Sequence, residues 1–361
     1  MKQLVINPGS TSTKVAVFEN ENMVFEKTLR HSVEELAPFE NIIDQFEIRK
    51  DVIMKSLKEN GMSINELSAV VGRGGLLKPM PGGTYIINEE ILNDLRAGTY
   101  GQHASNLGAI LAFEIAQEAD IPSFIVDSVV VDEMEPIAKL TGHPQFERKS
   151  IFHALNQKAI ARKSALVLGK EYEKVNLIIA HLGGGISVGA HKKGKIIDIN
   201  NALDGEGPYS PERSGTLPVG DLVNLAFSGK VSHEEMKKMI KGNGGLTAYL
   251  GTNDSKAISE MSKEGNQEAR LIYEGMAYQV AKEIGANAAV LEGEVDAIFI
   301  TGGIAYDETF VSWIRERIAF ISKVFVFPGE DELQALAEGG LRVLRGEEKA
   351  KIYAPDFAKV N

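Results

Sequence analysis

A short polar turn near the start of the chain carries the groups that bind phosphate. Residues 4–18 read L-V-I-N-P-G-S-T-S-T-K-V-A-V-F, which is an apolar run, a turn rich in hydroxyls and a second apolar run. This order predicts a β-hairpin whose tip gathers backbone N–H groups, small hydroxyls and one ammonium group. A phosphate accepts hydrogen bonds from donors of these kinds. A turn of this kind standing alone is more often a solvated hairpin.

The same pattern occurs a second time, so the turn does not stand alone. Residues 176–188 read N-L-I-I-A-H-L-G-G-G-I-S-V, again an apolar run, a turn of small residues and an apolar return. Further along, residues 67–75 resemble 295–303, each a buried-strand pattern that stops at glycines, and 121–127 pair with 323–327. We therefore expect two structural copies of one unit, each with three meandering strands followed by helices that alternate with strands.

The elements that must position these turns follow from periodicity. Apolar residues at spacings of three and four predict helices over residues 104–119, 152–168, 268–291 and 310–320. Helices alternating with strands predict an α/β fold with two mixed sheets whose parallel part is covered by helices. Residues 198–218 lack periodicity and are rich in Gly and Pro, which is typical of a long loop that is either functional or disordered.

The duplication also predicts where the chain divides. We expect a boundary near Lys149–Ser150, giving domains 1–149 and 150–361. A final helix over residues 333–344 is expected to pack back on the first domain.

Composition narrows the function classes. The net charge is −11 and no long basic run occurs, so a nucleic-acid partner is not expected. The chain has no Cys, which excludes disulfides, thiolate metal sites and cysteine nucleophiles. No apolar run approaches the ~20 residues of a membrane span, and the first residues do not read as a signal peptide. We therefore expect a cytoplasmic enzyme without a membrane partner.

The chain resembles the acetokinase family, and within it the butyrate kinases. Three features carry this resemblance: the duplication, the N-P-G-S-T-S-T-K turn and the H-L-G-G-G motif of residues 181–185. That family belongs to the superfamily of acetate and sugar kinases, heat-shock chaperones and actin. The resemblance implies two duplicated ribonuclease-H-like domains with ATP/ADP and a small carboxylic acid in the cleft between them. The first domain would lie on the acyl side and the second on the nucleotide side. The implied reaction is reversible, Mg²⁺-dependent transfer of a phosphoryl group from ATP to butyrate, giving butyryl phosphate, and a homo-oligomer is expected.

The resemblance also assigns catalytic roles, in a reaction that depends on positioning and charge neutralisation. The acceptor carboxylate is already ionised at neutral pH, so no general base is needed. Arg73 and Arg213 match the arginines that hold the carboxylate and the transferring phosphoryl group. His153 and His181 match the two active-site histidines that donate to its equatorial oxygens. Asp127 matches a carboxylate that organises magnesium. Taken singly, these arginines would be expected in surface ion pairs, the histidines in the core, and the aspartate as a cap.

Further positions follow from the same resemblance. The first phosphate motif would comprise Asn7, Ser10, Ser12 and Lys14. Backbone N–H groups at Gly183, Gly184 and Gly185 would approach the β- and γ-phosphates. Gly302, Gly303 and Ile304 would form the adenosine floor, and His103 would line the acyl site. For the second magnesium-linked carboxylate we expect Glu332, with Glu330 and Asp331 as alternatives. The remaining histidines, His31, His143, His191 and His233, are expected at the surface.

Three departures from acetate kinases favour a larger acid. Gly74 and Gly75 stand where those enzymes usually have valines, residues 203–207 replace a segment with a proline, and H-L-G-G-G replaces H-L-G-N-G. A wider acyl pocket would follow, and each buried methylene stabilises binding by roughly 0.8 kcal/mol, so two favour a four-carbon acid by about tenfold.

Other readings stay open. The alternatives within the class are kinases for isobutyrate, propionate or acetate. The alternative from another class is an actin- or chaperone-like ATPase without an acid substrate. A dinucleotide site would need a G-x-G-x-x-G after a strand, and the chain has none.

Overall fold

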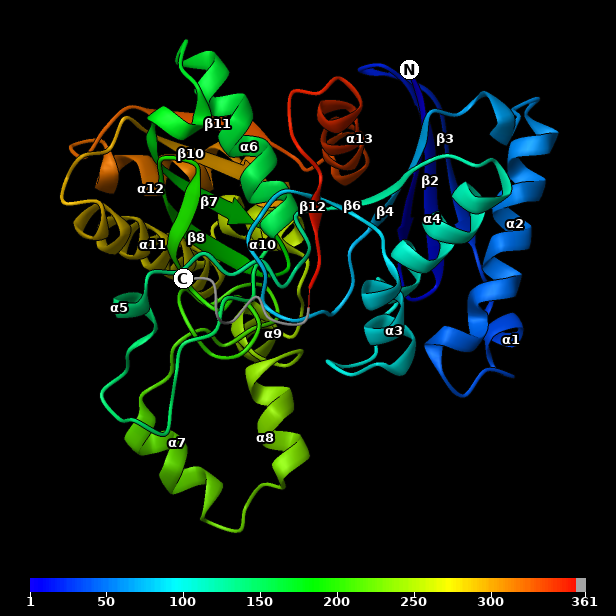
Figure 1. Ribbon diagram of the computed structural model, residues 1–361. Coiled ribbons are helices and arrows are strands. Elements are labelled where there is room, and N and C mark those ends of the chain that lie inside the picture. The colour runs from blue at the N-terminus through cyan, green and yellow to red at the C-terminus, as the bar shows by residue number, and fades with distance from the viewer. Residues whose placement is uncertain (355–361) are drawn as a thin grey trace. The chain divides into compact units, whose positions relative to one another are not determined.

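The chain forms two α/β units, each built on one mixed β-sheet (Figure 1). The computed structural model describes residues 1–354. Unit 1 comprises Met1–Asp132 together with the segment that starts at Asp331, and unit 2 comprises Glu133–Glu330. Throughout residues 1–354, every helix is too short or too polar to traverse a lipid bilayer.

Within residues 1–354, the sheet of unit 1 has seven strands. They are β1 (Lys2–Pro8), β2 (Ser12–Glu19), β3 (Asn22–Arg30), β4 (Ala69–Arg73), β5 (Thr84–Ile86), β6 (Ser123–Val126) and β12 (Lys351–Ile352). The order is β12-β5-β6-β4-β1-β2-β3. The first three strands form an antiparallel meander, and β1, β4 and β6 run parallel to one another. Because they are parallel, their carboxyl ends meet at one edge of the sheet.

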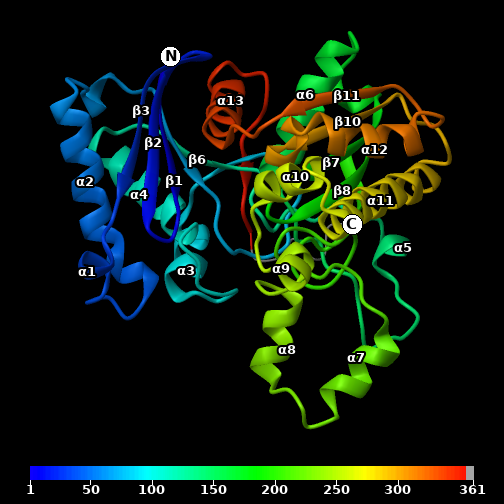
Figure 2. The same ribbon diagram turned by 180° about the vertical axis from the view of Figure 1, so that it is seen from behind.

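Helices cover both faces of this sheet. The helical segments of unit 1 are α1 (Val33–Leu36), η1 (Ile42–Gln45), α2 (Phe46–Glu59), η2 (Ile64–Glu66), α3 (Glu89–Ala97), α4 (Asn106–Glu118) and α13 (Glu332–Leu344). The core on the α4 side includes Leu4 and Ile6 of β1. On the other face, α13 packs closely because Gly340 brings its backbone against Gln3 and Val71 (Figures 1 and 2). The last helix therefore packs on the first sheet.

Unit 2 repeats the arrangement with five strands. They are β7 (Asn176–Leu182), β8 (Ile186–Lys192), β9 (Lys195–Ile199), β10 (Ala297–Gly302) and β11 (Val324–Pro328), in the order β11-β10-β7-β8-β9. This order and its strand directions match β6-β4-β1-β2-β3 of unit 1. Even the register shift between the second and third strands recurs, at Val17/Phe18 and at Ala190/His191. The predicted fold class, two copies of a mixed α/β unit, is confirmed.

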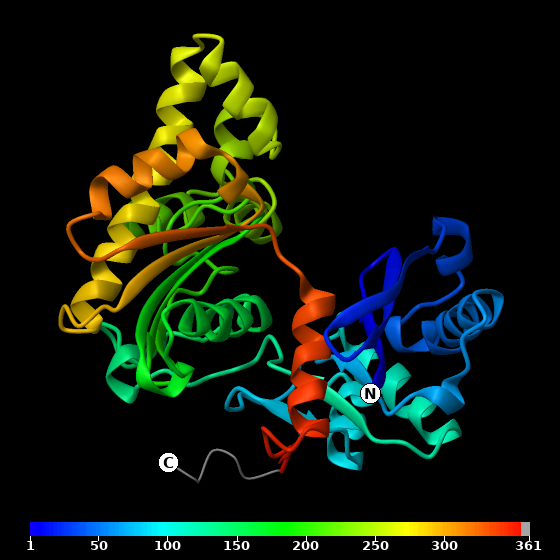
Figure 3. The same ribbon diagram turned by 90° about the horizontal axis from the view of Figure 1, so that it is seen from above.

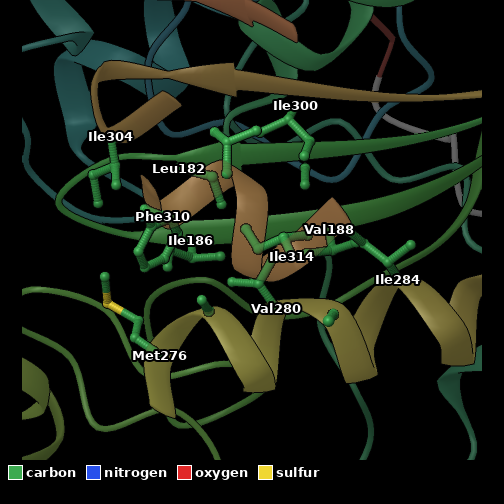
Figure 4. Packing of buried hydrophobic residues seen from close by; sticks show 14 of the residues in the cluster. Leu182, Ile186, Val188, Met276, Val280, Ile284, Ile300, Ile304, Phe310 and Ile314 are labelled. Carbon is green, nitrogen blue, oxygen red and sulfur yellow. The ribbon is translucent and has the colours of Figure 1, made fainter. Parts of the chain in front are cut away.

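Helices also cover both faces of the sheet of unit 2. The helical segments of this unit are α5 (Pro136–Lys139), α6 (Ala154–Val167), η3 (Tyr172–Lys174), α7 (Val219–Ala226), α8 (His233–Ile240), α9 (Gly245–Leu250), α10 (Ser255–Lys263), α11 (Gln267–Val290), η4 (Gly303–Tyr306) and α12 (Glu308–Ile318). Alternate residues of β7 face opposite sides, so Ile178 packs with α11 and Leu177 packs with α6. Figure 3 shows α6 (green) and α11 (gold) on opposite sides of the strands, and Figure 4 shows the α11 side of the core, where Val280 and Ile284 meet side chains of the strands.

The division of the chain falls earlier than the expected boundary at Lys149–Ser150. Residues 133–149 pack on unit 2, because Glu133 forms a buried ion pair with Lys158 (2.7 Å) and Arg148 forms a partly buried ion pair with Asp198 (2.8 Å). The sequence pattern placed this segment with the first sheet, whereas the ion pairs hold it against the second unit.

Candidate active site

The carboxyl ends of the parallel strands bring several candidate residues of unit 1 to one edge. Asn7 lies near the end of β1, Arg73 ends β4 and Asp127 follows β6. In the sheet, Ile6 lies opposite Gly72 and Arg73 lies opposite Val126, so the three strands end side by side. This is the edge at which open α/β sheets bind ligands.

The predicted phosphate turn is the tip of the β1–β2 hairpin. The Gly9 N–H donates to the Ser12 carbonyl (2.7 Å), which closes the turn. Ser10 and Thr11 are exposed at the tip, and no residue among 1–354 accepts a hydrogen bond from their N–H groups. Lys14 lies directly opposite Asn7 across the hairpin, so the two side chains share a face. Two N–H groups and one exposed ammonium are thus open to an anion.

Arg73, Asn7 and Glu332 form one polar cluster. Arg73 Nη1 lies 2.7 Å from the Glu332 carboxylate and donates to Asn7 Oδ1 (3.2 Å). The Asn7 amide also donates to Glu332 Oε2 (2.7 Å). Of the three acidic candidates of residues 330–332, Glu332 is therefore the one that contacts Arg73. Asp331 instead caps α13 by accepting from the Gln334 N–H (2.9 Å), and Glu330 belongs to unit 2.

Gly74 and Gly75 allow close packing behind Arg73. A Cβ at Gly74 would overlap the Ser128 side chain, and a Cβ at Gly75 would overlap Asn106. The volume that a valine would fill is therefore already occupied by neighbouring residues. The glycines at positions 74 and 75 therefore do not enlarge the acyl pocket as expected, because neighbouring residues fill the space that larger side chains would take.

Asp127 and His103 have well-defined surroundings. Asp127 is only 2% exposed, has a φ of 37°, and accepts a hydrogen bond from the Gly83 N–H (2.7 Å). Such left-handed backbone is unusual for a residue other than Gly and often accompanies a functional site. His103 contacts Ser105 Oγ through Nδ1 (2.8 Å) and lines a cavity of about 10 Å³, which has room for no more than one water molecule.

In unit 2 the matching turn joins β7 to β8. The Gly183 N–H donates to the Gly185 carbonyl (3.1 Å), and Gly184 is exposed. Gly185 permits close approach of Arg213, since a Cβ there would overlap the guanidinium group. Arg213 Nη1 donates to the Ala202 carbonyl (2.5 Å), whereas its Nε is buried without an acceptor in the described chain. Burial lowers the pKa of Arg213. An oxyanion bound here would supply the acceptor that the buried Nε–H lacks.

The two candidate histidines lie together. The rings of His153 and His181 stack with centroids 4.0 Å apart. His153 Nδ1 contacts Ser187 Oγ (3.1 Å), and His181 Nδ1 contacts Asn156 Oδ1 (2.8 Å). With the amide oxygen facing it, Nδ1 of His181 carries a hydrogen, so its Nε2 can donate only when the ring is protonated. Glu330 Oε2 lies 3.5 Å from that Nε2.

The expected adenosine floor lies at the end of β10. Gly302 has a φ of 90° and exchanges backbone hydrogen bonds with Gly329. The neighbouring Gly303 is exposed and has open space where a side chain would be. The side chain of Ile304, however, points into the hydrophobic core (Figure 4). Only its main chain could therefore meet a nucleotide.

Sequence reasoning missed several residues of this region. Asn156 and Ser187, which orient the histidines, are polar residues in elements that were predicted only as a helix and a strand. Two histidines expected at the surface, His31 and His191, are instead buried. Each is satisfied there by a hydroxyl, from Thr13 and Tyr172 respectively. Partners that lie 18 and 19 residues away leave no local signal.

The comparison with protein families decides the class. The acetate kinase model of the acetokinase family matches residues 142–353, which is more than half of the 361 residues. The chain belongs to the acetokinase family. As a member, it is a carboxylate kinase, a phosphotransferase that uses a carboxyl group as acceptor.

Solved structures resemble this acetokinase-family chain over nearly its whole length. Acetate kinase from Porphyromonas gingivalis is 21% identical, with a TM-score of 0.78 over 95% of this chain and 99% of that one. A propionate kinase from Francisella tularensis is also 21% identical, with a TM-score of 0.71 over 94% and 98%. Acetate kinase from Entamoeba histolytica is 18% identical, with a TM-score of 0.75 over 96% and 100%. At these identities the likeness shows a shared fold, including that of residues 1–141, which the family match does not reach.

Proposed function

We propose that this chain transfers a phosphoryl group from ATP to the carboxylate of a short-chain fatty acid, with butyrate as the preferred acid. One observation carries the proposal. Each sheet ends at its carboxyl edge in a glycine-containing turn, and each edge presents an arginine, Arg73 in unit 1 and Arg213 in unit 2. Open N–H groups and guanidinium donors are what a transferring phosphoryl group and a carboxylate require.

The residues of unit 1 are assigned to the acid and to a phosphate. Arg73 would pair with the carboxylate of the acid, since a guanidinium matches its two oxygens. Asn7 and Glu332 hold Arg73 in place through the contacts described above. Lys14, with the N–H groups of Ser10 and Thr11, would hold phosphate oxygens. Ser12 would be a further contact of the phosphate, and His103 would contact the acyl chain.

The residues of unit 2 are assigned to charge that develops on the phosphoryl group. Arg213, with its unpaired Nε, and the turn of residues 183–185 would hold phosphate oxygens. His153 and His181 would donate to the equatorial oxygens, and Asn156 and Ser187 fix the orientation of their rings. Donors fixed in advance need no reorganisation when charge develops. The backbone at Gly302 and Gly303 would lie under the adenosine.

ATP would supply the phosphoryl group, and Mg²⁺ would neutralise its phosphate oxygens. Mg²⁺ keeps most of its water and needs only one or two carboxylates. Asp127, at the end of β6, suits that role through water. Glu332 fits it less well, because the Arg73 guanidinium and the Asn7 amide already contact its carboxylate.

Two loop sequences support butyrate as the acid. The H-L-G-G-G turn and residues 203–207 both depart from the sequences common in acetate kinases. Arg213 contacts the turn at Gly185, and it donates to Ala202, the residue directly before the second segment. Isobutyrate, propionate and acetate are the alternative substrates. The test is kcat/KM measured with ATP, Mg²⁺ and straight-chain acids of two to five carbons. We expect a maximum at four carbons, and a maximum at two would contradict the preference.

We also propose that the enzyme is a homo-oligomer. Helix α7 buries none of its residues in the described chain, and α7 and α8 extend away from the sheet of unit 2 (Figures 1 and 2). Val219 and Val223 of α7, with Phe227 directly after its last residue, recur every four residues and are 71%, 48% and 88% exposed. An exposed apolar stripe of this kind supports a contact between copies.

A further inference from the structure

Arg49 of α2 is fully buried beneath the phosphate turn, and every one of its nitrogens is used. Its exposed fraction is 0%, and it is one of the largest completely buried side chains. Nη1 donates to the carbonyls of Gly9 (2.9 Å) and Ser12 (3.2 Å), and Nη2 donates to the carbonyl of Ser10 (2.9 Å). One guanidinium therefore holds three carbonyl groups of a single turn from below.

The charge of Arg49 is not neutralised by a carboxylate. Its other partners are Thr13 Oγ1 (3.0 Å) and Gln45 Oε1, which receives bonds from Nε (3.2 Å) and Nη2 (2.8 Å). Within residues 1–354, no Asp or Glu lies within ion-pair distance of it. A buried guanidinium is costly unless it is hydrogen-bonded, and here neutral acceptors satisfy it while its positive charge remains.

These bonds determine where the free donors of the turn point. In a trans peptide the C=O and the next N–H belong to one plane and point in opposite directions. Arg49 draws the carbonyls of Gly9 and Ser10 inward, so the N–H groups of Ser10 and Thr11 must point outward. Those are the two N–H groups of the tip that have no acceptor in the described chain. The buried charge lies behind them and favours an anion in front of them.

We propose that Arg49 is a positioning residue that forms the anion-binding turn from beneath, by aiming two backbone donors outward and by placing an uncompensated positive charge behind them. This inference rests on the proposed function only in that the anion is taken to be a phosphate of the nucleotide. Arg49 itself does not touch the ligand.

The surroundings of Thr13 agree with this role. Thr13 Oγ1 accepts from Arg49 and is also hydrogen-bonded to His31 Nε2 (3.0 Å), so the two basic side chains share one hydroxyl. Burial and the charge of Arg49 both lower the pKa of His31. Both effects disfavour a second cation beside Arg49, whose own charge is permanent.

The test uses the full chain and measures two affinities by calorimetry. One is for the non-hydrolysable ATP analogue AMP-PNP in the presence of Mg²⁺, and the other is for AMP. Arg49→Met removes the bonds and the charge, and we expect AMP-PNP to bind roughly tenfold more weakly, as for the loss of charged hydrogen bonds. AMP, which lacks the terminal phosphates, should change by less than about twofold, because its contacts lie elsewhere. Lys50→Met is the matched control, since Lys50 is the next residue of α2 and pairs with Glu118. It should leave both affinities unchanged.

Gln45→Glu separates this role from a purely structural one. A carboxylate at position 45 keeps both bonds to Arg49 and cancels its charge. We expect the melting temperature to be equal or higher, and AMP-PNP to bind at least about threefold more weakly because the field behind the turn is lost. A role in stability alone predicts no loss of affinity. This variant also decides the matter if Arg49→Met does not fold.

The outcomes are distinct. Unchanged AMP-PNP affinity in folded Arg49→Met, or in folded Gln45→Glu, overturns the inference and leaves the kinase proposal intact. A wild-type chain that binds AMP-PNP in an Arg49-dependent manner but phosphorylates no acid supports the inference and overturns the kinase proposal.

Discussion

The guanidinium of Arg73 lies 2.7 Å from the carboxylate of Glu332, across 259 residues of sequence. Both residues are at the carboxyl edge of the first sheet, Arg73 at the end of β4 and Glu332 in the first turn of α13. Glu332 holds the arginine in one orientation while leaving its second terminal nitrogen, Nη2, without a bond in the described chain. A carboxylate substrate would meet a guanidinium that is already placed.

Replacing Arg73 should therefore destroy turnover without unfolding the chain. We expect Arg73→Ala to lower kcat/KM for the acid by roughly three orders of magnitude, because paired charged hydrogen bonds to a carboxylate are lost where the transition state needs them. Steady-state kinetics and thermal melts measure the two effects. The control is Arg96→Ala, whose ion pair with Glu114 is exposed. Near-normal turnover by Arg73→Ala would remove it from the mechanism.

The histidine pair should depend on the residue that orients it. His181→Ala should reduce kcat by roughly a hundredfold, and Asn156→Ala by about tenfold, since a fixed donor to the phosphoryl group is lost or misdirected. Affinity for ATP should change little in either variant. His143→Ala, at an exposed position, is the control. Equal kcat in Asn156→Ala and wild type would show that ring orientation does not limit the reaction.

Glu283 gives a prediction for stability against pH. Burial, reinforced by Asp198 and Glu206 and opposed by Arg148, raises the pKa of Glu283. A carboxyl with a raised pKa in the folded state favours folding below its unfolded pKa, and this contribution is lost as pH rises through the folded pKa. At pH 7, above the unfolded pKa of Glu, this carboxyl therefore destabilises the fold.

Glu283→Gln should accordingly raise the melting temperature by a few degrees at pH 7, and the gain should shrink as pH falls toward about 4, near the unfolded pKa of Glu. Glu268→Gln, exposed at the start of the same helix, is the control and should show no such gain. A gain of the same size at both pH values would argue against a raised pKa for the partly buried Glu283.

The apolar stripe of α7 should govern assembly. Val223→Glu with Phe227→Glu places charge on the proposed contact between copies. We expect light scattering after gel filtration to show a smaller species than wild type at the same concentration, because apolar burial at the contact is replaced by charge. Glu234→Gln, exposed on α8, serves as the control. A wild-type chain that is monomeric at tens of micromolar would contradict the proposal.

The fold was accessible from sequence because its signals are local or repeated. The two apolar–turn–apolar patterns predicted both hairpins, and the repeated strands that stop at glycines predicted the parallel part of each sheet. The carboxyl-edge positions of Asn7, Arg73 and Asp127 follow directly from those strands.

Other features depend on contacts that sequence patterns do not show. Arg49 lies in a helix rich in charged residues, yet it is buried because the turn of residues 9–12 supplies carbonyl acceptors 37–40 residues away. His31 and His191 were expected at the surface, but they are buried beside partners 18 and 19 residues away. Gly74 and Gly75 predicted extra space, but the neighbouring Ser128 and Asn106 fill it.

The most direct test of the account is trapping of the product. ATP, Mg²⁺ and butyrate are incubated with the wild-type chain and hydroxylamine, and acyl hydroxamate and ADP are measured together. Transfer to a carboxylate predicts one hydroxamate for each ADP, with ADP release that depends on the acid and is lost in Arg73→Ala. ADP formed at the same rate without any acid, and without hydroxamate, would instead indicate an ATPase and contradict the central claim.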